Sequence, residues 1–105
     1  YIQIIGSNML VDGFDWDKGN ISKCQKHGLT VDEIESLFNN NPMMDVNIKH
    51  DLKEQRIQAI GKTYLNKHAF IVFTLRRRNN LLLIRPISAR YMHKKEIEYY
   101  EREEE

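Results

Sequence analysis

The spacing of apolar residues changes from helical to strand-like at the polar segment Asn39-Asn40-Asn41-Pro42. Before it, the apolar residues of 34–38 recur at helical spacing, and after it the apolar residues of 44–48 alternate with polar ones, as in a strand. Asn favours turns and Pro disfavours a helical residue before it, so the helical part is expected to end there. This change predicts an α+β fold with helices first and strands after them.

Two short helices are expected in the first part. Asp17 is a suitable N-cap for a helix that stops at Gly28, a residue suited to the left-handed conformation that follows a helix. Thr30 and Glu33 have the spacing of a capping box, in which the Thr hydroxyl accepts from the third amide and the Glu side chain reaches back. The second helix is therefore predicted to begin just after Thr30.

Four strands and a last helix are expected in the second part. The strands are predicted near 43–49, over 56–64, over 69–76 as the buried central strand, and over 81–87 as its neighbour, with a tight link at 77–80. Pro86 has no amide proton, so the last strand must end, bulge or lie at an edge there. We expect Ser88 to open a helix that runs to the C-terminus. The predicted fold is thus two N-terminal helices, a four-stranded antiparallel sheet and a C-terminal helix.

Size and composition limit the chain to one domain. It has 105 residues, and its longest near-apolar runs, 69–75 and 81–84, are far shorter than the roughly 20 residues of a membrane span. The single cysteine, Cys24, excludes an intrachain disulfide and a thiolate zinc cage, and no secretion signal is recognisable. We expect a cytoplasmic protein in which 9–105 form a single domain and 1–8 are an extension, left in part from cloning.

The net charge of +1 hides an asymmetry. Residues 96–105 hold six of the fifteen acids and one of the sixteen bases, which leaves fifteen bases against nine acids in residues 1–95, a net charge of +6. A basic body suggests a surface that binds a polyanion. The alternative is an ordinary small domain that ends in a solvated charged helix.

Arginine is the residue type most suggestive of function. Its planar fork matches phosphate oxygens and stays charged at physiological pH, so several arginines on one sheet can grip an RNA backbone and stabilise a transition state. The alternative is that some only keep the sheet soluble or pair with the acidic tail, and we favour it for those at the hairpin tip. The arginines on or beside the predicted sheet are Arg56, Arg76, Arg77, Arg78, Arg85 and Arg90.

Other reactive side chains carry weaker signals. His27 follows Lys26 at the end of the first predicted helix, where it suits either a cap or acid–base chemistry. Asp15 and Asp17 are expected to be structural, since two carboxylates alone make no metal site, and Cys24 is expected in the core. The other histidines are scattered and the glycines form no phosphate-binding loop, so we expect neither a metal nor an organic cofactor.

Three segments together resemble the BrnT toxins, the ribonuclease half of the BrnT–BrnA type II toxin–antitoxin systems of bacteria. The first is Phe14-Asp-Trp-Asp-Lys18 with Asn20, Lys23 and the Lys26-His-Gly28 run. The second is Glu54-Gln-Arg56 with Ile60-Gly61, and the third is Arg85-Pro-Ile-Ser-Ala-Arg90 with Lys95, Glu96 and Tyr99-Tyr100. The resemblance covers about residues 14–101.

The resemblance implies a fold similar to RelE-type microbial ribonucleases and RNA cleavage without metal, in which the 2′-hydroxyl of the substrate attacks the adjacent phosphate. Carried over by position, it implies Arg56, Arg85, Arg76 and His27 as catalytic residues. It implies Lys26 and Arg90 as supporting, RNA-binding residues, and Arg77 and Arg78 of the arginine cluster are the further RNA-binding candidates. The implied partner is a BrnA-like antitoxin, in a heterotetramer where the antitoxin bridges to operator DNA.

The rival interpretation is a non-catalytic basic module that acts only within a regulatory protein–DNA complex. A basic sheet predicts RNA affinity in both cases, so turnover and not binding separates them. We further expect the antitoxin to cover the arginine face, and the acidic tail not to neutralise the toxin.

Overall fold

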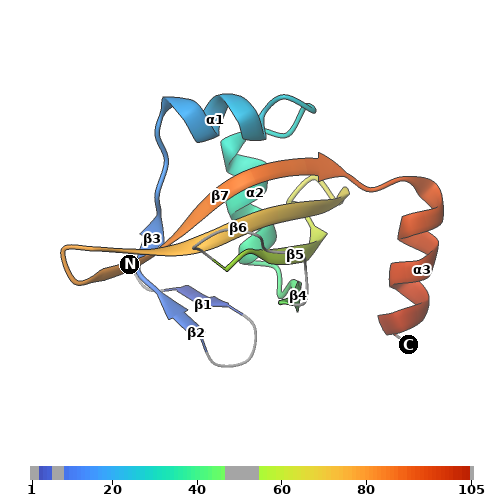
Figure 1. The fold of residues 1–105 in the computed structure, drawn as a ribbon. Coiled ribbons are helices and arrows are strands. Elements are labelled where there is room, and N and C mark those ends of the chain that lie inside the picture. Colours follow the sequence, from blue (N-terminus) through green and yellow to red (C-terminus); the bar gives the residue numbers. More distant parts are fainter. Residues whose placement is uncertain (1–2, 6–8, 47–54, 105) are drawn as a thin grey trace.

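The computed structural model describes residues 3–5, 9–46 and 55–104, which form an α+β domain, as predicted (Figure 1). The strands of its main sheet lie in the order β3 (Gly13–Phe14), β7 (Leu81–Tyr91), β6 (His68–Arg78), β5 (Ile57–Lys62) and β4 (Met43–Asp45). The helices are α1 (Lys18–Cys24), α2 (Val31–Phe38) and α3 (Lys94–Glu104). A separate ribbon pairs β1 (Gln3–Ile5) with β2 (Met9–Val11).

The main sheet has five strands and mixed direction, so the prediction of a four-stranded antiparallel sheet is wrong in both respects. The additional strand, β3, runs parallel to β7, with Gly13 opposite Leu83. The amides of Asp12 and Asp15 extend this pairing by donating to β7 carbonyls at 2.8 Å. A two-residue strand is too short for a periodic pattern, because its strand state comes from pairing with a distant part of the chain.

A two-residue turn joins β6 to β7. Asn79 and Asn80 have φ angles of 50° and 69°, the left-handed values that a tight hairpin turn requires and that Asn tolerates. The predicted hairpin is confirmed, but its link is shorter than expected. Arg77 and Arg78 belong to the end of β6 and not to the link.

Strand β7 continues past Pro86, so the prediction that Ser88 opens a helix is wrong. Pro86 pairs with Phe73 and Ser88 pairs with Val72, which leaves Ile87 as the extra residue of a β-bulge. The bulge absorbs the missing amide of Pro86, and the ladder then extends to Tyr91 before α3 begins at Lys94. A bulge was one of the three outcomes expected at this proline.

Both predicted helix starts are confirmed. Asp17 caps α1 by accepting from the Asn20 amide, and Thr30 with Glu33 forms the capping box of α2. The first helix ends earlier than predicted, at Cys24, and Gly28 follows it with a φ of 102°. This positive φ confirms the left-handed conformation expected at the glycine.

The core lies between α2 and one face of the sheet. Ile34, Leu37 and Phe38 of α2 are fully buried, and Phe38 packs edge-on against Phe73 of β6 with ring centroids 5.0 Å apart. Figure 1 shows α2 behind the sheet, α1 beside β7 and α3 beyond the far end of β7. The predicted placement of Cys24 in the core is also confirmed.

Side chains alternate between the two faces of β5 and β6. Ile57 and Ala59 of β5 are buried toward α2, as are Ala69, Ile71 and Phe73 of β6. The even-numbered residues of 58–62 and 68–76, with their partners on β7, lie on the opposite face, which we call the open face. The central position predicted for the 69–76 strand is confirmed.

The strand predicted near 43–49 is confirmed over Met43–Asp45, and its residues 47–49 lie outside the described part of the chain. No helix within the described residues is long and apolar enough to cross a membrane.

Candidate active site

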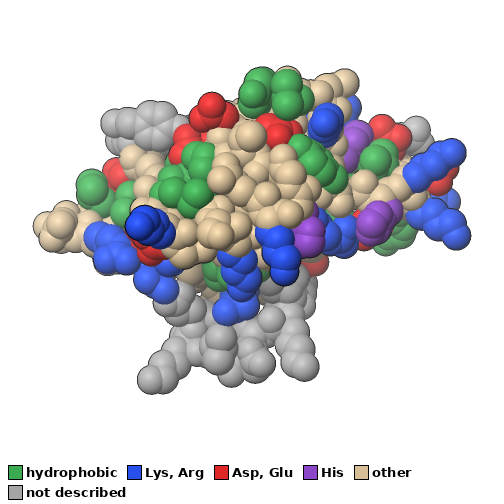
Figure 2. Space-filling view, turned by 90° about the horizontal axis from the view of Figure 1, so that it is seen from above, with side chains coloured by type: hydrophobic (Ala, Val, Ile, Leu, Met, Phe, Trp, Pro, Cys, Tyr) green, Lys and Arg blue, Asp and Glu red, His purple; other side chains and the backbone are tan. Residues whose placement is uncertain are grey.

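Basic side chains collect on the open face. Figure 2 shows Lys and Arg side chains gathered along one side of the molecule, the lower side in that view. The strand register explains why they meet: Thr74 of β6 is opposite Arg85 of β7, and Phe70 is opposite Arg90. Between these two rows, Val72 lies beside Gln58 of β5 and Ser88 of β7.

A pocket of about 130 Å³ opens on this middle row. It brings together residues of β5, β6, β7 and the loop after α1, although they are far apart in the sequence. The polar groups that line it come from three separate parts of the chain, so no single local motif indicates that they meet. Its lining residues are His27, Gln58, Phe70, Val72, Ser88, Ala89 and Arg90.

His27 reaches the pocket from the loop after α1. The helix ends at Cys24, and Gly28 then turns the chain back toward Tyr91, whose ring lies 3.5 Å from the position of a Cβ on that glycine. His27 is exposed in this loop. An exposed imidazole beside a basic surface is suited to acid–base chemistry.

Arg90 is held on two sides. Its guanidinium carbon lies 4.5 Å from the centroid of the Phe70 ring, and its two terminal nitrogens donate to the carboxylate of Glu96 at 3.0 and 2.9 Å. The hydrogen bonds with Glu96 raise the pKa of Arg90 further above its ordinary value. The same bonds, with a smaller effect from the His93 amide, lower the pKa of Glu96 to about 2. Arg90 is thus a fixed, fully charged fork at the rim of the pocket.

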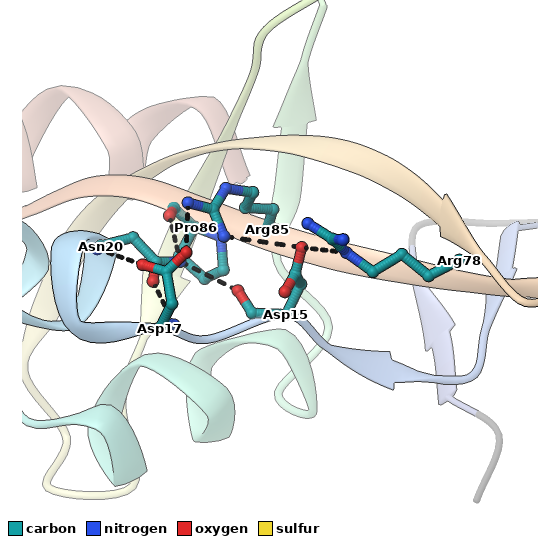
Figure 3. Close-up of polar contacts among 6 residues, drawn as sticks. All are labelled: Asp15, Asp17, Asn20, Arg78, Arg85 and Pro86. Carbon is teal, nitrogen blue, oxygen red and sulfur yellow. Dashed lines mark hydrogen bonds and ion pairs between the residues drawn. The ribbon is translucent and has the colours of Figure 1, made fainter.

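Arg85 is paired with the carboxylates of Asp15 and Asp17 (Figure 3). It donates to Asp17 at 2.9 Å and lies 3.5 Å from Asp15, while Arg78 donates to Asp15 at 3.0 Å. The pKa of Asp17 is lowered, first by the hydrogen bond from the Asn20 amide and then by the one from Arg85. The carboxylates of Asp15 and Asp17 therefore compensate much of the positive charge of Arg85 and Arg78 before any ligand binds.

Residues of the motif at 14–20 attach the helices to the strands that carry the open face. Asn20 is buried and donates to the carbonyls of Pro86 and Asp15 at 3.0 and 2.9 Å, which joins α1 to the bulge of β7. The Trp16 indole donates to Glu35 of α2 at 2.9 Å. The structural role predicted for Asp15 and Asp17 agrees with these contacts, whereas the linking role of Asn20 was missed.

The remaining sequence candidates do not line the pocket. Arg56 directly precedes β5 and is half-buried, and Arg76 is half-buried in β6. Arg77 and Lys26 are exposed. Of the eight candidates, His27 and Arg90 line this pocket. Sequence reasoning missed Gln58, Ser88 and Phe70, although strand alternation already placed Gln58 beside Arg56 on one face.

Two further features bear on reactivity: whether the described residues form a metal-binding cluster, and the burial of Cys24. Within 3–5, 9–46 and 55–104, no three His, Cys, Asp or Glu side chains lie close enough together to hold a metal ion, and His50 and Asp51 lie outside these ranges. Burial raises the pKa of the Cys24 thiol to about 11, which keeps it protonated at neutral pH.

Comparison with family models relates this chain to known proteins. Residues 16–96 match the family model described as ribonuclease toxin, BrnT, of type II toxin–antitoxin system. Among curated proteins, none matches this chain. The matched segment includes all the residues that line the pocket, from His27 to Arg90.

Proposed function

The chain belongs to the BrnT family of ribonuclease toxins of type II toxin–antitoxin systems, and on this premise we propose that it is an endoribonuclease whose active site is the pocket between His27 and Arg90. The observation that carries this proposal is the convergence of these two side chains on one pocket of the open face. An imidazole and a guanidinium together supply proton transfer and phosphate binding, the two requirements of RNA cleavage.

The proposed reaction uses the RNA as its own nucleophile. His27 accepts the proton of a 2′-hydroxyl as its oxygen attacks the adjacent phosphorus, and the bond from phosphorus to the 5′-oxygen then breaks. Water protonates the departing 5′-oxygen, because the pocket is open to solvent. The products are a 2′,3′-cyclic phosphate and a 5′-hydroxyl, and no metal takes part.

Arg90 binds the phosphate in this scheme. A guanidinium has five N–H groups, and three hydrogen bonds run from Arg90 to Glu96 and the Tyr91 carbonyl. A phosphate that approaches from the pocket binds the Arg90 guanidinium beside Glu96, so that this guanidinium then contacts two anions. Stacking on Phe70 keeps the plane of the guanidinium fixed, so little side-chain entropy is lost on binding.

The other basic residues hold the RNA on both sides of the pocket. We assign phosphate contacts to Arg56, Arg76 and Arg85, and outer backbone contacts to Lys26 and Arg78. Arg77 alternates with Arg76 and Arg78 along β6 and therefore lies on the other face of the strand. Within this group, Arg85 and Arg78 must share their charge with Asp15 and Asp17. We therefore expect Arg85 and Arg78 to contribute less to the transition state than the resemblance alone implied.

The family implies an antitoxin partner as well as an RNA substrate. We propose that the antitoxin inhibits by covering the open face with carboxylates, because that face carries the charge that RNA needs. A RelE-type fold, a heterotetramer with the antitoxin and its bridging to operator DNA belong to the same proposal.

The test is the cleavage of RNA by purified protein with one histidine replaced. His27→Ala is expected to lower the cleavage rate by about 10²- to 10⁴-fold, the range for a general acid–base group. His93→Ala is the matched control, because His93 is also exposed and does not line the pocket. Equal activity of His27→Ala and wild type would remove His27 from the reaction. Absence of any turnover by the wild type would favour the non-catalytic module.

A further inference from the structure

An apolar groove of about 380 Å³ lies between α3 and the open face. No step of the proposed cleavage uses it. Two of its side chains are unusually accessible for their type, since Met43 is 39% exposed and Tyr99 is 61% exposed. Its walls are Met43, Ile60, Phe70, Met92, Tyr99 and Tyr100, with Lys95 and Glu96 among its lining residues.

The groove begins where the pocket ends. Phe70 lines both of them, and Arg90 stacks over its ring. The register places Ile60, Phe70 and Arg90 side by side on β5, β6 and β7. A phosphate bound by Arg90 therefore carries its attached nucleotides to the entrance of the groove.

We propose that this groove binds the nucleobase of a nucleotide next to the scissile phosphate. The inference rests on the proposed cleavage at the His27–Arg90 pocket. Single-stranded RNA is bound by splaying bases out and stacking them on aromatic side chains. The groove provides such a side chain in Tyr99, whose ring is accessible and has few rotamers to lose.

The size and polarity of the groove suit a heterocycle. Its volume lies at the small end of the range of about 300–1,000 Å³ for ligand sites, which leaves room for one planar ring system and not for a helix. Its walls are mostly apolar, and Lys95 and Glu96 add a donor and an acceptor for the edge of a base. The groove thereby determines which bases are accepted beside the cleaved bond.

The experiment compares Tyr99→Ala with Tyr64→Ala, a tyrosine of similar exposure (63%) that does not line the groove. The substrate is a DNA oligonucleotide with a single ribonucleotide, built around a sequence that the wild type cleaves in a long RNA. Versions lacking the base on either side of the scissile phosphate complete the set. Removal of one of these bases is expected to lower the wild-type kcat/KM by about 5- to 100-fold, as for a lost base–aromatic stack.

Tyr99→Ala is expected to cleave the intact substrate with a kcat/KM lowered by the same factor. Removal of the base should not lower the kcat/KM of this variant any further. Tyr64→Ala is expected to behave as the wild type on both substrates. Met43→Ala, from the opposite wall, is the second variant and is expected to show the same non-additivity. Wild-type rates for both variants, with the abasic penalty unchanged, would overturn the base site. Unchanged cleavage combined with escape from the antitoxin would also overturn it and assign the groove to that partner. Failure of the wild type to cleave any substrate would instead reject the proposed function.

Discussion

Arg85 lies between two carboxylates, and these neighbours determine its chemistry. Only 18% of its side chain is exposed, and its terminal nitrogens face Asp15 and Asp17. Arginines that look alike in the sequence therefore differ in the positive charge that they present to RNA, because that charge depends on carboxylate partners elsewhere in the chain. Arg77 is the contrasting residue, since it is exposed near the end of β6.

Replacing Arg85 by Ala should lower both RNA cleavage and stability more than replacing Arg77. Loss of Arg85 removes a fixed cation from the open face and leaves two carboxylates without it, so we expect a rate loss of about 10- to 100-fold and destabilisation of about 1–3 kcal/mol. Cleavage assays and urea denaturation of both variants measure these effects. Full activity of Arg85→Ala with normal stability would show that the Asp15–Arg85–Asp17 cluster serves neither purpose.

Helix α3 is attached to the sheet by a small set of specific contacts. Glu96 binds the fork of Arg90, and Tyr100 is buried with its ring 5.6 Å from that of His68. The Glu96 carboxylate also accepts from the His93 amide at 2.8 Å, at the start of the helix. One acidic residue thus caps the helix and docks it beside the pocket.

The Glu96 contact should make stability depend on acid. Its pKa in the folded protein is about 2, below the 4.5 of an ordinary Glu, so the charged form stabilises the folded state. That contribution is complete above pH ~5 and is lost as the pH falls toward 2. Urea midpoints should therefore fall more steeply over this range for the wild type than for Glu96→Gln, with Glu98→Gln, an exposed neighbour, as the control. Parallel curves for the wild type and Glu96→Gln would show that the ion pair does not stabilise the fold.

The whole molecule combines a basic body with an acidic C-terminal segment. Part of that segment is used within the fold, since Glu96 pairs with Arg90. The open face still presents arginines from β6 and β7, together with Arg56 before β5, to a bound polyanion. In the proposed mechanism, such a surface supplies the positive charge that a metal ion provides in other nucleases.

Cleavage of RNA by the purified protein should continue in EDTA. The expected rate is within about twofold of the rate with magnesium, because arginine stabilises the phosphate charge directly. The measurement is a time course of a labelled RNA in EDTA, in magnesium and in manganese, with His27→Ala as the negative control. Loss of cleavage in EDTA that magnesium or manganese restores would reject the mechanism and return attention to Asp15 and Asp17.

The sequence by itself determined the features that depend on neighbouring residues. The caps at Asp17 and Thr30, the alternation along β5 and the turn at Asn79-Asn80 all follow from local spacing and backbone preference, and the structure contains them. The family resemblance depended on the same local motifs, and the match over residues 16–96 confirms it.

The tertiary structure alone decided the features that depend on distant pairing. Strand β3 exists because it pairs with β7, and β7 passes Pro86 because a bulge against β6 absorbs the missing amide. His27 and Arg90 share a pocket because α1 packs against β7, and Arg85 is compensated because the segment that follows β3 brings Asp15 and Asp17 beside it. The spacing of residues within one strand does not determine how that strand is aligned with its neighbours. The sequence therefore identified several of the site's residues but not which of them share a pocket.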